Sequence, residues 1–113
     1  MFQIRISYPA QADLEHILAV SLERWGADGQ ARYQDLLAAA FRAIASNPKG
    51  PTTRDRKALL TGIRSFHIRH LRRDHGVRDP VHVIYYRVHR ASIEIVRVLR
   101  ERMDPAAHLQ IVR

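Results

Sequence analysis

The stretch VHVIYYRVHRASIEIVRVL, residues 81–99, decides the fold. Residues 81–88 and 92–99 are rich in β-branched and aromatic side chains, which favour β-strands. Only the short link at residues 89–91 separates them, so we expect the two strands to pair as a β-hairpin. Both segments are apolar on both faces for part of their length. This pattern is typical of strands that helices cover on one side and a second layer or a partner covers on the other.

The N-terminal half of the chain shows one strand pattern followed by two helix patterns. Residues 2–8 alternate between apolar and polar side chains, as a half-buried strand does. Apolar side chains then recur at helical spacing over residues 11–25 and over residues 33–44, and Asn47-Pro48 ends the second helix. The link GADG, residues 26–29, is short, so we expect the two helices to form an antiparallel hairpin.

A polar loop, a strand and a charged connection are expected between the helices and the β-hairpin. Residues 49–57 are polar and basic, and we expect them to form a loop. Residues 63–70 read as a strand, and the connection LRRDHGVRDP at residues 71–80 carries turn signals. Alternation along that strand places Arg64, Phe66, Ile68 and His70 on one face and Ser65, His67 and Arg69 on the other.

The C-terminal segment predicts a short helix. Asp104 is a favourable N-cap and Pro105 a favourable first helical residue, so we expect a helix over residues 105–112. The apolar side chains expected to pack this helix against the sheet are Met103, Leu109 and Ile111.

The length and the order of elements predict one α+β domain. The order is strand, helix, helix and then three strands (β-α-α-β-β-β), followed by the short C-terminal helix. An antiparallel helical hairpin packed on a mainly antiparallel sheet satisfies this order. The 113 residues suffice for one hydrophobic core, so we assign residues 1–113 to a single domain.

The composition is that of a globular and strongly basic protein, with 46% hydrophobic and 27% charged residues. Cysteine is absent, which excludes disulfides and thiolate metal sites. No apolar run approaches the roughly 20 residues of a membrane span, and the N-terminal strand pattern is not that of a signal peptide, so we expect a cytoplasmic protein. The net charge of +8 indicates an anionic partner (nucleic acid, a membrane surface or an acidic protein) or a basic surface that is simply solvated.

No motif for a metal, a nucleotide or a covalent nucleophile is present. Of the seven histidines, His67 and His70 fall on opposite faces of one expected strand, and His16 has no ligand partner four residues away. A G-x-S-x-G elbow, a G-x-G-x-x-G loop and a Walker loop are all absent. We therefore expect neither a metal site nor a cofactor.

Metal-free cleavage of RNA is the enzymatic alternative. It needs a general base, a general acid and cations for the phosphate. The expected strands carry residues of these types: Arg64, His67, Arg69, His82, Arg87 and Arg97. Nothing in their spacing demands such a site, and arginines at strand edges are more often solvated or docked on an acidic segment.

A basic nucleic-acid surface is a further alternative. The residues that offer contacts to phosphates are Arg54, Arg56, Lys57, Arg69, Arg72, Arg73 and Arg78. The sequence lacks a recognition-helix signature and the aromatic stacking pair of an RNA-recognition module, so this signal is non-specific.

Motifs in collinear order over nearly the whole chain resemble the ParE toxins of the ParE/RelE toxin–antitoxin superfamily. These motifs are AQADLEHI at 10–17, WG at 25–26, NPKG at 47–50, LLTGIRSFHIRH at 59–70, VHVIYYRV at 81–88 and IEIVRVLRERMDPAAHL at 93–109. The resemblance implies the toxin of a type II toxin–antitoxin system that poisons DNA gyrase by trapping it with cleaved DNA. It also implies a hetero-oligomer with a ParD-like antitoxin, whose C-terminal segment wraps the toxin. That antitoxin's ribbon-helix-helix dimer binds the operator, so the toxin reaches DNA only indirectly, and no membrane partner is implied.

RelE-type relatives share this fold but cleave messenger RNA on the ribosome, which is the alternative function. Their last strand runs into a basic G-K-R-like segment and a near-terminal tyrosine. Here the segment reads LRERMD, residues 99–104, and no tyrosine follows Tyr86. This departure favours a binding-type poison without catalytic residues of its own. An inactive family member retained as a regulator is the third hypothesis.

The resemblance and the charge pattern point to the segment from Arg100 to His108 as a functional edge. We expect the Asp104-capped helix to hold the arginines of this edge in place. Many relatives carry histidine at position 100, so the role of Arg100 is left open. The residues expected to bind the target or the antitoxin are Arg64, Arg69, Arg87, Arg97, Arg100, Arg102, Met103, Asp104 and His108.

Overall fold

The computed structural model describes residues 2–109 of an α+β fold. The elements are β1 (Gln3–Ile6), α1 (Tyr8–Ser46), β2 (Thr53–Asp55), β3 (Ile63–His67), the 3-10 helix η1 (Ile68–Asp74), β4 (His82–His89), β5 (Ser92–Arg100) and α2 (Pro105–Leu109). The sheet order is β1-β5-β4-β3-β2, with β1 parallel to β5 and the other neighbours antiparallel. The expected α+β class, the mainly antiparallel sheet and the hairpin at residues 81–99 are confirmed.

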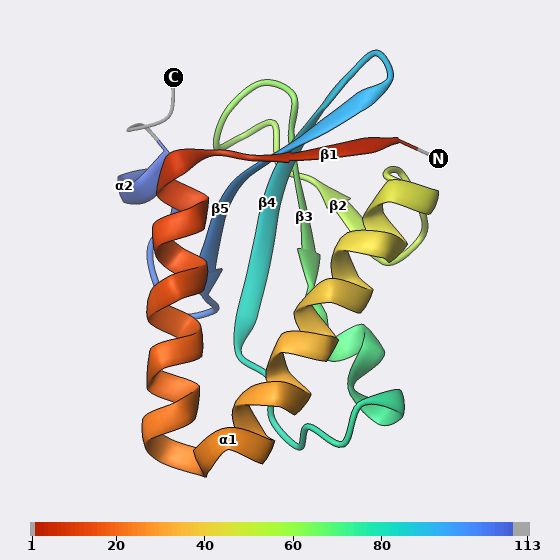
Figure 1. Cartoon of the computed structure of the whole chain (residues 1–113). Helices are drawn as coiled ribbons and strands as arrows, with labels where there is room; N and C mark the ends of the chain where they lie inside the picture. Colours follow the sequence, from red (N-terminus) through yellow and green to blue (C-terminus); the bar gives the residue numbers. More distant parts are fainter. Residues whose placement is uncertain (1, 110–113) are drawn as a thin grey trace.

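The long helix α1 is a hairpin of two arms. The hydroxyl of Ser7 caps its N-terminus by accepting a hydrogen bond of 3.2 Å from the backbone N–H of Ala10. The helix turns at Gly26, whose φ of +74° lies in the left-handed region that side-chain-bearing residues rarely adopt. The two arms diverge from this bend and lie on the same face of the sheet (Figure 1). The observed link between the arms is shorter than the predicted residues 26–29, because the helix resumes directly after Gly26.

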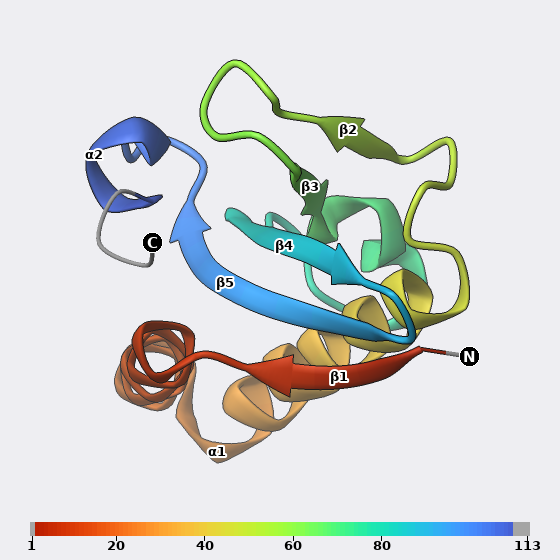
Figure 2. The same cartoon turned by 90° about the horizontal axis from the view of Figure 1, so that it is seen from above.

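The sheet buries an apolar core on each face, and it lies between α1 on one side and α2 on the other (Figure 2). The larger core packs against α1 and includes Ile17, Tyr33, Leu36, Leu37, Ile44, Phe66, Ile68, Ile84, Tyr86, Ile93, Ile95 and Val98. The smaller core contains Ile63, Tyr85, Val96, Leu99 and Leu109. Strands buried on both faces explain why residues 81–99 are apolar on both faces, as read from the sequence.

Strand β5 contains a β-bulge next to its pairing with β1. Tyr85 pairs with Arg97 and Tyr86 pairs with Ile95, so Val96 is the extra residue on β5. The pairing of β1 with β5 ends at Ile95. The bulge therefore marks the position where β5 leaves the cover of β1 and needs other hydrogen-bond partners along that edge.

Two expectations about the strands were wrong. Residues 53–55, expected within a polar loop, form the edge strand β2, which pairs with β3. This three-residue edge strand is held by backbone hydrogen bonds to β3, so its sequence shows no alternation of apolar and polar residues that would have predicted it. Residues 68–70, expected to continue β3, begin η1 instead, because the Nδ1 atom of His67 accepts a hydrogen bond of 3.1 Å from the backbone N–H of Arg69 and turns the chain.

The short helix α2 follows the sequence expectation in its cap and its buried anchor. Leu109 is buried in the smaller core, as expected. Met103 is 38% exposed and is absent from that core, contrary to expectation. Ile111 and the expected extension of the helix to residue 112 lie outside the described residues.

Candidate partner-binding surface

The edge of β5 beyond the bulge is covered by the first turns of α1. The hydroxyl of Ser7 donates a hydrogen bond of 2.8 Å to the carbonyl of Val96, and Asp13 accepts one of 2.9 Å from the backbone N–H of Val98. Asp13 also accepts two hydrogen bonds of 2.8 Å from the guanidinium of Arg97. The Arg97 and Asp13 side chains are only 12% and 14% exposed. These hydrogen bonds raise the pKa of Arg97 further and fix the first arm of α1 to the sheet.

The same arginine fixes the C-terminal helix. The guanidinium of Arg97 donates a hydrogen bond of 3.2 Å to the carbonyl of His108. At the start of α2, Asp104 accepts a hydrogen bond of 3.1 Å from the backbone N–H of Ala106, as its expected N-cap role requires. Together with the burial of Leu109, these contacts hold the segment after β5 in one position.

A cavity of about 620 Å³ lies between α1, the start of β4 and the end of β5. Its lining residues are Ala12, Asp13, His16, Ile17, Val20, Ser21, Arg24, Trp25, Tyr33, Asp79, Val81, His82, Val98, Leu99, Arg100 and Met103. Most of these side chains are apolar, and the exposed Arg24 and Arg100 add positive charge at its border. Two of the lining residues, Trp25 and Met103, are large apolar side chains that are unusually exposed, at 55% and 38%.

A tyrosine–histidine pair forms one wall of this cavity. The Tyr33 hydroxyl lies 2.5 Å from Nδ1 of His82 and accepts a hydrogen bond of 3.3 Å from the backbone N–H of Val81. Because the tyrosine oxygen already accepts from Val81, we assign its proton to the bond with His82. Burial raises the pKa of Tyr33 to about 12 and lowers the pKa of His82 to about 4. The wall is therefore uncharged at neutral pH.

A second histidine joins the ends of β3 and β5. Nε2 of His67 lies 2.7 Å from a carboxylate oxygen of Glu101, and its Nδ1 accepts from the backbone N–H of Arg69. The hydrogen bond from His67 lowers the pKa of Glu101. With both ring nitrogens engaged, His67 has no nitrogen free to take a proton from a substrate in this geometry.

Arg64 and Arg87 lie in internal hydrogen bonds on the sheet. Arg64 donates to the carbonyl of Pro48 at 3.2 Å and to the hydroxyl of Thr53 at 2.8 Å, which ties β2 and β3 to the end of α1. Arg87 pairs with Glu94 at 3.1 Å, and both side chains are 25% exposed. These contacts link neighbouring segments of the fold.

The sequence model of the family "ParE toxin of type II toxin-antitoxin system, parDE" matches residues 4–105. The chain belongs to the ParE toxin family. Toxin ParE1 of Caulobacter vibrioides is 35% identical over 105 residues, covering 93% of this chain and 95% of that protein. Toxin ParE1 of Mycobacterium tuberculosis is 32% identical over 100 residues, covering 88% and 89%. A solved structure named as a chromosomal ParDE system from P. aeruginosa shares the fold, with a TM-score of 0.67, 16% identity and coverage of 88% and 96%.

In this ParE toxin the expected site residues separate into two groups. Arg64, Arg87, Arg97, Asp104 and His108 make the internal contacts described above. Exposed side chains belong to Arg69, Arg100, Arg102 and Met103. Of these exposed residues, Arg100 and Met103 line the 620 Å³ cavity.

The residues that sequence reasoning missed in this ParE toxin are the partners of those arginines and the aromatic wall. Asp13 had no distinguishing pattern on its helix, and Tyr33 read only as part of an apolar stripe. The sequence did contain one signal for such a contact, which is Arg97 within an apolar strand. A buried guanidinium requires a carboxylate or carbonyl partner.

Over residues 2–109 of the toxin, no three His, Asp or Glu side chains come together as metal ligands would. None of the helices described there is both long enough and apolar enough to cross a bilayer.

Proposed function

We propose that this ParE toxin acts in the cytoplasm by binding DNA gyrase and trapping it with cleaved DNA, without catalysis of its own. The observation that carries the proposal is the state of the histidines on the described strands. His67 is bonded to Glu101, His82 to Tyr33 and His89 to Glu94. A ribosome-dependent nuclease needs a side chain free to exchange protons with the 2′-hydroxyl. His67 has both ring nitrogens bonded within the protein, and His82 and His89 have one each, so each of the three takes part in holding the fold together.

The partner proposed to hold the toxin inactive is a ParD-like antitoxin. The net charge of +8 and the apolar cavity bordered by Arg24 and Arg100 favour a partner segment that is acidic and amphipathic. The solved structure that shares this fold is named as a ParDE system, which supports a partner of that class. Contact with operator DNA then belongs to the antitoxin.

Cleavage of supercoiled plasmid by purified gyrase tests the target. With the toxin present, we expect linear plasmid to appear when the reaction is stopped with detergent, and we expect this product to decrease when the antitoxin is added. RNA cut at defined positions by the toxin with ribosomes, together with no linear plasmid, would refute the proposal and favour the RelE-like activity.

Variants of the exposed residues after β5 and at its end test whether this edge contacts gyrase. We expect Arg100→Ala, Arg102→Ala and Met103→Ala to lower gyrase trapping while the folded content, measured by circular dichroism, is unchanged. Arg42→Ala is the matched control, because Arg42 is an exposed arginine on the second arm of α1, away from this edge. If all three edge variants trap gyrase as well as Arg42→Ala does, the edge is not the contact surface.

A further inference from the structure

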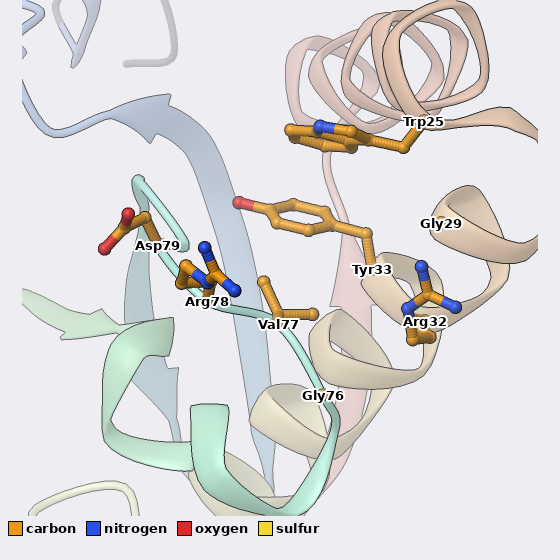
Figure 3. Close-up of a pocket in the computed structure, with 8 residues that line it drawn as sticks. All are labelled: Trp25, Gly29, Arg32, Tyr33, Gly76, Val77, Arg78 and Asp79. Carbon is orange, nitrogen blue, oxygen red and sulfur yellow. The ribbon is translucent and has the colours of Figure 1, made fainter.

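A second cavity lies at the bend of α1, between the helix hairpin and the segment before β4 (Figure 3). Its volume is about 320 Å³. Its lining residues are Trp25, Gly29, Arg32, Tyr33, Gly76, Val77, Arg78 and Asp79. The volume is at the lower end of ligand pockets, which are typically ~300–1,000 Å³, and so suits a small planar group.

The indole of Trp25 is exposed yet held in place. It is 55% exposed, and the ring of Tyr33 supports it with centroids 6.1 Å apart and planes tilted by 33°. Figure 3 shows the two rings one above the other. Gly29 permits this arrangement, because a Cβ at that position would overlap the Cβ of Trp25. The pocket therefore presents a large aromatic surface whose position is fixed by its neighbours.

The side chains of Arg78 and Arg32 lie on either side of the Tyr33 ring in the close-up (Figure 3). Arg32 and Arg78 are both exposed, and neither makes an ion pair within residues 2–109. The backbone of Gly76, with φ of +66°, passes close to Arg32, since a Cβ built there would lie 3.4 Å from its Cδ. Asp79 adds a carboxylate, a hydrogen-bond acceptor, to the lining.

We propose that this pocket binds a nucleobase with its flanking phosphates, as presented by single-stranded nucleic acid. A base stacks on Trp25, the guanidiniums of Arg32 and Arg78 each meet one of the phosphates that flank the base, and Asp79 accepts from an N–H group of the base. Val77 is the one aliphatic side chain among the lining residues, so the aliphatic side chains of a peptide find few partners here. A duplex keeps its bases stacked inside the helix and offers none to the indole.

Fluorescence of the isolated toxin tests this proposal directly, because Trp25 is the only tryptophan in the chain. We expect single-stranded oligo-dT or oligo-U to quench the emission of Trp25 and a duplex of equal length to quench it much less. A thymidine or uridine mononucleotide forms a separate arm of the titration. Quenching by the mononucleotide at the concentration of strand nucleotides would assign the site to free nucleotides, and quenching by the strand alone would assign it to nucleic acid.

Variants measured with a labelled oligonucleotide identify the residues. We expect Trp25→Leu to weaken binding by about 5- to 150-fold, the usual range for one stacked base. We expect Arg32→Ala and Arg78→Ala each to reduce the slope of log affinity against log salt by about 0.7, one phosphate contact of a single strand. The control is Arg42→Ala, which carries the same charge change on the same helix about 15 Å from Arg32.

The outcomes separate this proposal from the proposed action on gyrase, because no gyrase is present. Equal affinity of Trp25→Leu and the unchanged protein for oligonucleotide overturns it. The proposal is also overturned if Arg42→Ala reduces the slope of log affinity against log salt as much as Arg78→Ala does. Quenching by an acidic aromatic peptide, with none by oligonucleotide, would replace nucleic acid by a protein partner.

Discussion

Removing the carboxylate of Asp13 tests whether the contact between α1 and β5 holds the two layers together. In Asp13→Ala the Arg97 guanidinium loses two hydrogen bonds and the backbone N–H of Val98 loses its one. The Arg97 side chain is 12% exposed, so solvent replaces these partners poorly.

The expected loss of stability is large for one exchange. Breaking a buried ion pair by removing one partner costs about 3–5 kcal/mol. The small remaining exposure of both side chains, and the bond from Arg97 to the carbonyl of His108, place the expected value at the lower end, about 3 kcal/mol. With a urea dependence of ~1.5 kcal/mol per molar, the unfolding midpoint falls by about 2 M.

Equilibrium unfolding in urea, followed by far-ultraviolet circular dichroism, measures this loss. Glu15→Ala is the matched control, since Glu15 is an exposed acid on the same turn region and its removal changes stability by at most ~0.5 kcal/mol. Combining Asp13→Ala with Arg97→Met removes the orphaned charge, so we expect the double variant to recover part of the loss. A midpoint for Asp13→Ala equal to that of Glu15→Ala would refute the reasoning.

The pH dependence of unfolding, the bend of α1 and the anchor of α2 give three further predictions. His82 has a pKa of about 4 in the fold against an ordinary 6.5, so the unfolded chain takes up the proton first as the pH falls. The free energy of unfolding therefore decreases by up to ~3 kcal/mol as the pH falls from ~6.5 to ~4. The variant His82→Phe, unfolded in urea over the same pH range, should not show this decrease. Gly26→Ala forces a side chain into the left-handed region and should cost about 1–2 kcal/mol in the same urea assay, without changing the helix content of the folded state. Leu109→Ala should cost about 2–5 kcal/mol in thermal melts, because its side chain is 2% exposed; a cost below ~1 kcal/mol would show that α2 does not close the smaller core.

The sequence predicted the elements whose side chains repeat with a clear period. Strands β4 and β5 and both arms of α1 were identified because each buries a long apolar surface. Strand β2 was missed because its Thr-Arg-Asp sequence has no apolar face and its stability comes from backbone pairing with β3. The end of β3 was misplaced because the turn there depends on one side-chain bond from His67 to the backbone of Arg69.

The candidate site was less predictable than the fold. Arg97 and Arg100 lie on the same strand, yet one is bonded to Asp13 and the other is exposed at the cavity. Sequence spacing assigns both to the end of an apolar strand and has no information on a carboxylate 84 positions away. The family resemblance recovered the identity as a ParE toxin, whereas the roles of individual arginines required the three-dimensional contacts.

The parallel pairing of β1 with β5 determines at what point of translation the sheet can be completed. Strand β1 pairs with residues 92–95, and the hydroxyl of Ser7 donates to the carbonyl of Val96, 89 positions later. Contacts that distant in sequence form only after all the intervening residues have been translated. A chain that ends before β5 therefore lacks the partner of β1 and the core residues Ile93, Ile95 and Val98, which pack with α1. The finished surface of the toxin therefore forms only after β5 has been translated.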